Sequence, residues 1–391
     1  MLARTLPHVW RAHHGMFATA SSLVLILCCG RIAPQSHAVR PITAAPDIAL
    51  GRRIDSAITS EMRARSIPGA SVAILRHDTL IYIAGYGVTR LDKPAPVRPS
   101  TIFQIASLTK PFTAMAVMML VEDGRIELDA PASRYVSELP AIYSTITVRQ
   151  LLTHTSGINP DMRLANVDEM ALPEFWRRLG ERPMSFAPGT SIQYANAGYT
   201  VLSVIVERAS GLPFGEFLRR RIFAPLGMTS TGYRMPQRDD SMHAVGYDLV
   251  DGRNVAAPHI FSGWGNSGIE STAEDLARFA AAIERRDLLK GSSYDLVFTP
   301  GKLANGNPAG FTFSGAPAYY GFGWFLTTYR GRVLHTHGGA IAGFSSILNR
   351  FPEQGYSIVV LSNGKQGADR LGQADALARA TATVLGFQKA P

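Results

Sequence analysis

The chain has 391 residues, of which 46% are hydrophobic and 18% are charged, with 36 Gly, 24 Pro and 2 Cys. This apolar content can form a core and excludes a disordered chain, Gly lacks the three-residue period of collagen, and two cysteines cannot form a disulfide framework. The formal net charge of +9 includes one tight basic run, Arg219-Arg220-Arg221, which we interpret as a solvated helix face and not as a nucleic-acid site.

The N-terminus (residues 1–38) has the pattern of a secretory signal peptide. Arg4 and Arg11 precede an apolar run from Met16 to Cys29, which is shorter than the roughly 18 apolar residues of a membrane span. Small residues predict cleavage after Ala38. The residues before Cys28 lack the small residue of a lipid-attachment site, so cleavage is favoured over lipidation. The mature chain would contain no cysteine and carry a net charge of +6, which suits the periplasm or the extracellular space without membrane insertion.

The mature chain is predicted to begin with a helix over Leu50–Arg65 and a β-hairpin of Ala70–Leu75 and Leu80–Ala84. Between the later helices, Asn159–Gly189 is predicted to be an irregular loop or a lid over a site. The helices predicted for the middle of the chain are Pro111–Val121, which is apolar on nearly every side, Val148–His154, Ala197–Ala209 and Pro213–Ala224.

The C-terminal third is predicted to start with a helix that follows a capping box at Ser271–Asp275. Strands at both chain ends with helices between them indicate an α/β protein of the α+β type. The C-terminal strands are expected to form an antiparallel meander closed by a helix. The predicted C-terminal elements are the strands Gly321–Thr328, Arg332–His337, Phe344–Phe351 and Ser357–Leu361 and the helix Ala374–Val384.

Ser107 and Lys110 are one helical turn apart at the start of the predicted buried helix. Free backbone N–H groups at a helix N-terminus favour developing negative charge. Apolar neighbours push a lysine toward its neutral form, which can accept a serine proton. A Ser-x-x-Lys tetrad also occurs by chance, with the serine as an ordinary N-cap, so chemistry at this position needs support from other segments.

Two later segments can provide that support. Tyr194 and Asn196 lie between a turn and a helix, so their side chains can point into a cleft, where a tyrosine hydroxyl can relay a proton and an amide can bind a substrate. His337-Gly338-Gly339 ends a predicted strand, and its glycines leave room for a ligand beside the backbone.

Together these segments resemble the serine β-lactamase and penicillin-binding-protein superfamily, in the branch of class C β-lactamases, D-alanyl-D-alanine carboxypeptidases and related esterases. The stretch Ile102–Thr113 is similar to the nucleophile region of that superfamily. Leu151–Gly157 and Ser271–Leu276 are similar to further landmarks, and their order and spacing agree from about Ile54 to Leu385.

The resemblance implies an antiparallel sheet built from both chain ends and flanked by helices, in one domain over residues 39–391 with a mainly helical region at about residues 107–225. It also implies a serine hydrolase that forms an acyl-enzyme and needs no cofactor or metal, and the predicted signal peptide indicates that this hydrolase is exported. The resemblance assigns Ser107 as the acylated nucleophile, Lys110 as its base, Tyr194 as the partner in proton transfer and Asn196 as a ligand of the substrate amide. The backbone N–H groups of Ser107 and Ala340 would form the oxyanion hole.

The resemblance also includes a departure at His337, with Gly338 and Gly339 after it. Many members of the superfamily have a lysine at this position, which pairs with the substrate carboxylate. A histidine with an ordinary pKa near ~6.5 is largely neutral at about pH 7.5, so we expect His337 to be a hydrogen-bonding group of the substrate site. Weak hydrolysis of carboxylate-bearing β-lactams follows from this expectation.

Other site types are less favoured by the sequence. Gly263–Gly268 matches G-x-G-x-x-G, but no clear strand precedes it, which argues against a dinucleotide site. His335 and His337 share one strand face without a third ligand nearby in the sequence, which argues against zinc. His154 is expected to hold a turn and not to transfer protons. The sequence contains no Gly-x-Ser-x-Gly, so it lacks the nucleophile elbow of α/β-hydrolases.

The substrate stays open at this level. An ester or an amide such as a D-amino-acid peptide is the main hypothesis, and the alternatives are a β-lactam or a sensor or binding domain that does not turn over. We expect a small-molecule or peptide substrate and no nucleic acid. The choice of substrate is expected to depend on the segments Asn159–Gly189 and Leu289–Ala318.

Overall fold

The computed structural model describes residues 47–160, 171–236, 240–260, 264–313, 316–366 and 372–387. The predicted signal peptide with its two cysteines lies outside the described residues, as do residues 161–170 of the predicted lid. Within the described part of the chain, no helix has the length and apolar character needed to cross a membrane.

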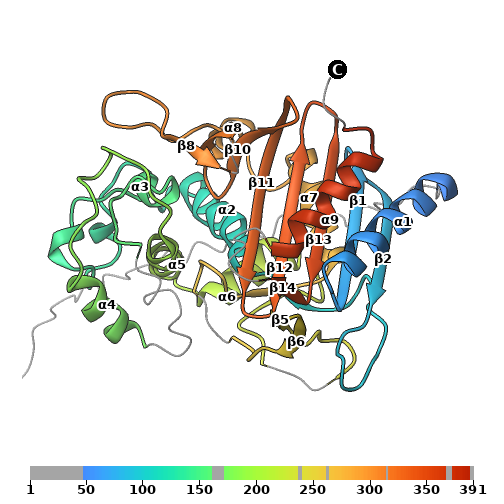
Figure 1. Ribbon diagram of the computed structural model, residues 1–391. Coiled ribbons are helices and arrows are strands. Elements are labelled where there is room, and N and C mark those ends of the chain that lie inside the picture. The colour runs from blue at the N-terminus through green and yellow to red at the C-terminus, as the bar shows by residue number, and fades with distance from the viewer. Residues whose placement is uncertain are drawn as a thin grey trace, which may run out of the picture. The chain divides into compact units, whose positions relative to one another are not determined.

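An antiparallel sheet built from both ends of the chain forms the centre of the described structure (Figure 1). Its eight strands follow the order β2-β1-β13-β12-β11-β10-β9-β8, so the N-terminal hairpin pairs with a strand from the C-terminal end. This confirms the predicted fold class. The strands are β1 (Gly69–Arg76), β2 (Thr79–Gly87), β8 (Gly310–Phe313), β9 (Ala316–Tyr320), β10 (Phe325–Tyr329), β11 (Arg332–Ile341), β12 (Phe344–Phe351) and β13 (Tyr356–Ser362).

The two faces of this sheet contribute to two separate cores, because successive side chains of a strand point to opposite faces. On β1, Val72 and Ile74 belong to one core, whereas Ala73 and Leu75 belong to the other. The continuously apolar sequence of β1 and β13 is therefore explained by helices on both faces.

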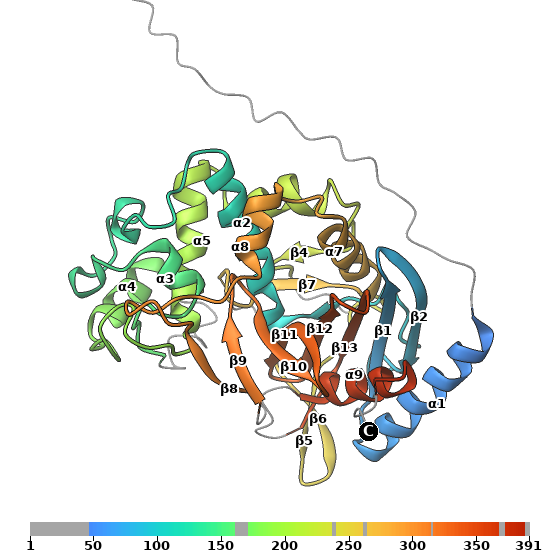
Figure 2. The ribbon, with the colours of Figure 1, turned by 90° about the horizontal axis from the view of Figure 1, so that it is seen from above.

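Helices cover both faces (Figure 2). The terminal helices α1 (Ile48–Ala64) and α9 (Gly372–Val384) pack on the first core, with Ile54, Ile58 and Leu377 completely buried. The second core includes α2 (Thr109–Glu122), α7 (Ala273–Arg285) and α8 (Gly291–Val297). The Thr272 hydroxyl caps α7 by accepting a hydrogen bond from the Asp275 N–H group, as its sequence predicts.

The middle of the chain is helical and extends the second core. Nearly every residue of α2 is buried, which agrees with its apolar sequence on all sides. The remaining helices are α3 (Val148–Leu152), α4 (Leu172–Gly180), α5 (Asn196–Ser210) and α6 (Phe214–Leu218), which continues as a π-helical turn over Arg219–Phe223. Two small sheets contain β3 (Phe103–Gln104), β7 (Ile269–Ser271) and β4 (Gly232–Tyr233), and β14 (Gly364–Gln366), β5 (Tyr247–Val250) and β6 (Arg253–Ala256).

The structure corrects three boundaries. Within Asn159–Gly189, α4 forms a regular helix because Phe175, Trp176 and Leu179 lie on one buried face. The predicted strand Gly321–Thr328 starts only at Phe325, because Gly323 has a φ of 82° and forms a turn. The strand predicted to end at His337 continues to Ile341, because Gly338 and Gly339 remain paired with β12.

Candidate active site

Ser107 lies in a tight turn between a strand and the buried helix. A short 3₁₀ segment, Ala106–Leu108, connects β3 to α2, and Ser107 is partly exposed while both neighbours are buried. Ala106 adopts a φ of 48°, an uncommon conformation for a residue other than glycine. The hydroxyl of Thr109 accepts a hydrogen bond of 3.1 Å from the Ile269 N–H group of β7, which anchors the helix start beside the nucleophile.

Lys110 is completely buried and its amine has three polar neighbours. Nζ lies 3.1 Å from Ser107 Oγ, 2.7 Å from Asn196 Oδ1 and 2.9 Å from the carbonyl oxygen of Asn266. Burial holds the pKa of Lys110 well below its ordinary value, which favours the neutral amine. A neutral amine has two N–H donors and one lone pair. The two amide oxygens can only accept hydrogen bonds, so the lone pair is left to face the hydroxyl of Ser107.

Tyr194 and Asn196 approach this pair from the segment that leads into α5. Nζ of Lys110 lies 4.8 Å from the ring centroid of Tyr194 and 5.6 Å from that of Tyr199. Burial raises the pKa of the Tyr194 phenol, and a hydrogen bond with Ser107 opposes that increase. Tyr194 is therefore a neutral phenol next to the nucleophile, in a position to exchange a proton with it.

The strand β11 passes directly behind the nucleophile turn. A Cβ atom added to Gly339 would lie 2.1 Å from the Ile105 carbonyl oxygen and 2.9 Å from the backbone nitrogen of Ser107, so only glycine fits there. The Ser346 hydroxyl of β12 also donates a hydrogen bond of 2.7 Å to the Ile105 carbonyl. The next residue on β11, Ala340, is partly exposed.

His337 is completely buried behind the site. Its Nδ1 donates a hydrogen bond of 2.8 Å to the Gly338 carbonyl, and its Nε2 accepts one of 3.0 Å from the hydroxyl of Tyr320. Burial and the nearby Lys110 lower the pKa of His337 to about 3, so the ring is neutral at pH 7. Both ring nitrogens are occupied by protein groups. The geometry therefore favours a structural position behind β11 over a direct contact with substrate.

The structure brings Ser107, Lys110, Tyr194 and Asn196 together, with the segment from His337 to Ala340 beside them. His335 lies apart from them: its ring stacks on Phe298 at 4.8 Å, and burial and Arg350 lower its pKa to about 4. In the part of the chain that the structure describes, no group of three His, Cys, Asp or Glu residues is arranged to hold a metal ion.

The sequence does not predict four further contributors to the site. Asn266 contributes a main-chain carbonyl, which carries no side-chain signal, although it lies in the glycine-rich segment weighed as a nucleotide motif. The Gly265 carbonyl of the same segment accepts a hydrogen bond of 2.6 Å from the Thr113 hydroxyl of α2. Tyr199 and Tyr320 line the buried side of the site, and Tyr320 comes from β9, which the sequence analysis did not predict.

The chain is similar to known proteins over most of its length. Residues 54–383 match the family described as Beta-lactamase. The chain is 29% identical over 314 residues to Penicillin-binding protein 4* of Bacillus subtilis (strain 168), which covers 74% of this chain and 67% of the relative. Curated relatives from Staphylococcus aureus are likewise longer than the matched segment, which spans 62 to 63% of their length.

Two solved structures have a similar fold. The octameric penicillin-binding protein homologue from Pyrococcus abyssi superimposes with a TM-score of 0.74 and 28% identity, over 86% of this chain and 77% of that chain. The D-amino acid amidase from Ochrobactrum anthropi SV3, complexed with L-phenylalanine amide, gives a TM-score of 0.71 and 26% identity, over 85% of this chain and 98% of that chain.

Proposed function

Because this chain belongs to the beta-lactamase family and is a serine hydrolase, we propose that it cleaves a small ester or amide, such as a D-amino-acid peptide, through an acyl-enzyme on Ser107. The observation that carries this proposal is the environment of Lys110. A buried amine 3.1 Å from a serine hydroxyl, with both of its N–H donors taken by amide oxygens, is arranged as a general base.

In the proposed acylation, Ser107 Oγ attacks the substrate carbonyl carbon while its proton moves to Nζ of Lys110. The resulting ammonium keeps the same three neighbours and gains attraction from the adjacent ring face of Tyr194. The backbone N–H groups of Ser107 and Ala340 hold the oxyanion. When the intermediate collapses, the departing alcohol or amine takes up the proton, which passes from Lys110 through the Tyr194 hydroxyl, and water then hydrolyses the acyl-enzyme.

The substrate preference follows from which groups of the site are exposed. The Lys110 amine is completely buried, and the neutral His337 is buried as well. Neither is available to pair with a substrate carboxylate. Uncharged esters and amides are therefore expected to react faster than carboxylate-bearing β-lactams. The similarity to a D-amino acid amidase favours amides of D-amino acids among these.

A substrate panel tests the proposal. The purified protein is mixed with a short nitrophenyl ester, a D-phenylalanine amide, a D-Ala-D-Ala peptide and nitrocefin, with the Ser107→Ala variant as the matched control. We expect turnover of the ester and of at least one D-amino-acid substrate, slower turnover of nitrocefin, and none by the variant. Acylation without turnover would assign the protein to the sensor class, and faster turnover of nitrocefin than of the ester would contradict the preference.

We also propose that the enzyme is exported and cleaved after Ala38. The support comes from the basic, apolar and small-residue order of the N-terminal segment. N-terminal sequencing of the protein recovered from the periplasm or medium is expected to start at Val39. Recovery of an acylated N-terminal Cys would favour lipid anchoring instead.

A further inference from the structure

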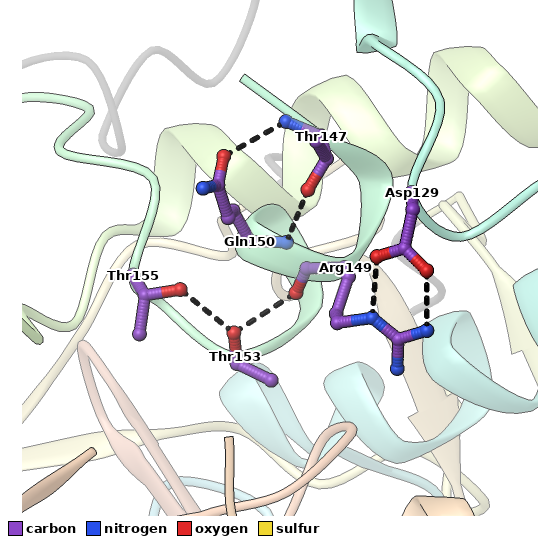
Figure 3. Close-up of polar contacts among 6 residues, drawn as sticks. All are labelled: Asp129, Thr147, Arg149, Gln150, Thr153 and Thr155. Carbon is purple, nitrogen blue, oxygen red and sulfur yellow. Dashed lines mark hydrogen bonds and ion pairs between the residues drawn. The ribbon is translucent and has the colours of Figure 1, made fainter. Parts of the chain in front are cut away.

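The short helix α3 is anchored firmly at both ends (Figure 3). At its start, the Thr147 hydroxyl accepts from the Gln150 N–H group at 3.2 Å and the Gln150 side chain accepts from the Thr147 N–H group at 3.0 Å. Arg149 forms a two-pronged ion pair with Asp129 at 2.7 and 2.8 Å. At its end, the Thr153 hydroxyl donates to the Arg149 carbonyl at 2.9 Å. These bonds fix the position and direction of the chain where it leaves α3.

His154 follows directly and is fixed by its neighbours. The hydroxyls of Thr153 and Thr155 bond each other at 3.0 Å across it (Figure 3), and the Thr155 N–H group donates to the Gln150 carbonyl at 2.9 Å. His154 has a φ of 58°, which turns the chain sharply. Its carbonyl accepts a hydrogen bond of 3.0 Å from the N–H group of Gln193, the residue before Tyr194. The backbone of His154 therefore holds the segment that carries Tyr194.

The imidazole of His154 holds the same segment from the other side. It is 2% exposed, and its Nδ1 accepts a hydrogen bond of 3.3 Å from the N–H group of Ala195, which separates Tyr194 from Asn196. The ring centroid lies 4.4 Å from that of Tyr194 and 4.5 Å from that of Tyr320. One side chain thus contacts both the backbone and the ring of the segment that provides two site residues.

The second nitrogen of His154 is unusual. Nε2 is buried and has no hydrogen-bond partner among the described residues. Since Nδ1 accepts the Ala195 N–H group, the neutral ring must carry its proton on Nε2, where that donor is left unsatisfied. An unsatisfied buried donor is unfavourable. An apolar ring would not carry this donor, but it would also remove the acceptor for the Ala195 N–H group.

We propose that His154 is a positioning residue for the reaction, which sets the places of the Tyr194 hydroxyl and the Asn196 amide through the N–H group of Ala195. This inference rests on the proposed function. Asn196 Oδ1 is 2.7 Å from Lys110 Nζ, and a shift of this segment would change that hydrogen bond and the contact of Tyr194 with Ser107. His154 itself touches neither Ser107 nor the substrate in this scheme. Burial and the proximity of Lys110 and His337 lower its pKa, so the required neutral ring persists at neutral pH.

Two substitutions at position 154 test the hydrogen-bond acceptor and the aromatic ring of His154 independently. His154→Phe keeps an aromatic ring and removes the acceptor, whereas His154→Asn removes the ring and places an amide oxygen at the position of Nδ1. Asparagine also tolerates a positive φ. We expect His154→Phe to lower kcat on the best panel substrate about 30- to 100-fold with KM within about threefold, because small misplacements of reacting groups cost about that much. His154→Asn should restore kcat to within about tenfold of the unsubstituted enzyme.

His335→Phe is the matched control, since this histidine is on β11, stacks on Phe298 and lies outside the site. It should leave kcat within about twofold. In a Tyr194→Phe background, His154→Phe should cause a smaller loss of kcat than in the unsubstituted enzyme, because part of its effect acts through Tyr194. If His154→Phe does not fold, His154→Gln replaces it, because the longer side chain cannot place an acceptor at the Nδ1 position.

The outcomes distinguish the two proposals. If the unsubstituted enzyme neither labels at Ser107 nor turns over any substrate of the panel, the proposed function fails. If it is active and His154→Phe keeps kcat within about threefold, or if His154→Asn is as impaired as His154→Phe, the positioning role of His154 is overturned while the function stands. Equal losses in His154→Phe and His335→Phe would also overturn it, since a general packing effect would then explain both.

Discussion

At the scale of single residues, the site combines a buried amine with uncharged acceptors. Lys110 is surrounded by a hydroxyl, an amide and a main-chain carbonyl, and its neighbours His154 and His337 have lowered pKa values that keep them neutral. Burial without a compensating anion is what makes a lysine a base near neutral pH. The partly exposed Ser107 is left as the group that can meet a substrate.

A first prediction concerns this pair. Lys110→Ala should reduce the acylation rate by at least about a thousandfold, nearly as much as Ser107→Ala, and the double variant should be no worse, because nucleophile and base act as one unit. Stopped-flow measurement of the nitrophenolate burst tests this. If Lys110→Ala kept acylation within about tenfold, equivalent to about 1.4 kcal/mol in the barrier, Lys110 would not be the base.

A second prediction concerns pH. The lysine accepts a proton only when neutral, so kcat/KM should rise with pH through the lowered pKa of Lys110 and then level off. His337, with a pKa of about 3, should already be neutral over that rise. A profile recorded from about pH 4 to 10 checks this, and His337→Gln should retain the same acidic limb. If the limb disappeared in His337→Gln, the titration would belong to the histidine.

The sequence predicts that the side chains of Ser107 and Lys110 lie close together, because about one helical turn separates them along the chain, and the structure places their polar atoms 3.1 Å apart. The sequence could not supply Asn266 or Tyr320. The first contributes a backbone carbonyl, and the second comes from β9, whose place near His337 depends on the strand order. A residue whose role depends on contacts with distant parts of the chain leaves no local sequence pattern that predicts this role.

At the scale of elements, β11 and the nucleophile turn are in backbone contact. A Cβ at Gly339 would overlap the Ile105 carbonyl at 2.1 Å, whereas a Cβ at Gly338 would come no closer than 3.2 Å to the Ser346 carbonyl. The two glycines are adjacent in sequence and differ in what they face. Gly339 faces the nucleophile turn, and its lack of a Cβ atom allows β11 to approach that turn closely.

This contrast gives a third prediction. Gly339→Ala should force β11 away from Ser107, lowering kcat at least about a hundredfold, because the distance between the two proposed oxyanion donors depends on this contact. Gly338→Ala should lower kcat less than about tenfold. Steady-state kinetics and melting temperatures of both variants provide the check. Comparable losses in the two would show that the contact at Gly339 does not govern the site.

The helices and central strands followed their sequence patterns because burial on one or both faces fixed their periodicity. The elements that the sequence does not predict also have a physical explanation. The sequence predicts irregular chain in place of α4, because Pro173 and the short length of the helix obscure the buried face of Phe175 and Leu179. β8 is the edge strand of the sheet and β9 pairs with it, and both contain polar and small residues, so their strand character arises from pairing and not from composition.

At the scale of the whole described structure, two cores lie on opposite faces of one sheet, and the groups of the site belong to only one of them. Tyr194 packs against the second core, whereas Leu377 of α9 belongs to the first, with Ile54 and Ile58 of α1. Stability contributed by the terminal helices is thereby separated in space from the chemistry at Ser107.

A fourth prediction follows. Leu377→Ala should lower the free energy of unfolding by about 2–5 kcal/mol, the usual cost of a cavity at a fully buried leucine. At temperatures where the variant is folded, kcat/KM should stay within about twofold. Denaturant unfolding together with kinetics measures both quantities. A large kinetic loss at unchanged folding would mean that the two faces are coupled.

The central claim is that Ser107 is the acylated nucleophile and that Lys110 activates it. The most direct measurement is intact-mass analysis and peptide mapping after incubation with a serine-directed fluorophosphonate, for the unsubstituted protein and for Lys110→Ala. We predict a single adduct on the peptide that contains Ser107, formed rapidly by the unsubstituted protein and at least about a thousandfold more slowly by the variant. An adduct at another residue, or turnover of the ester with Ser107 unlabelled, would contradict it.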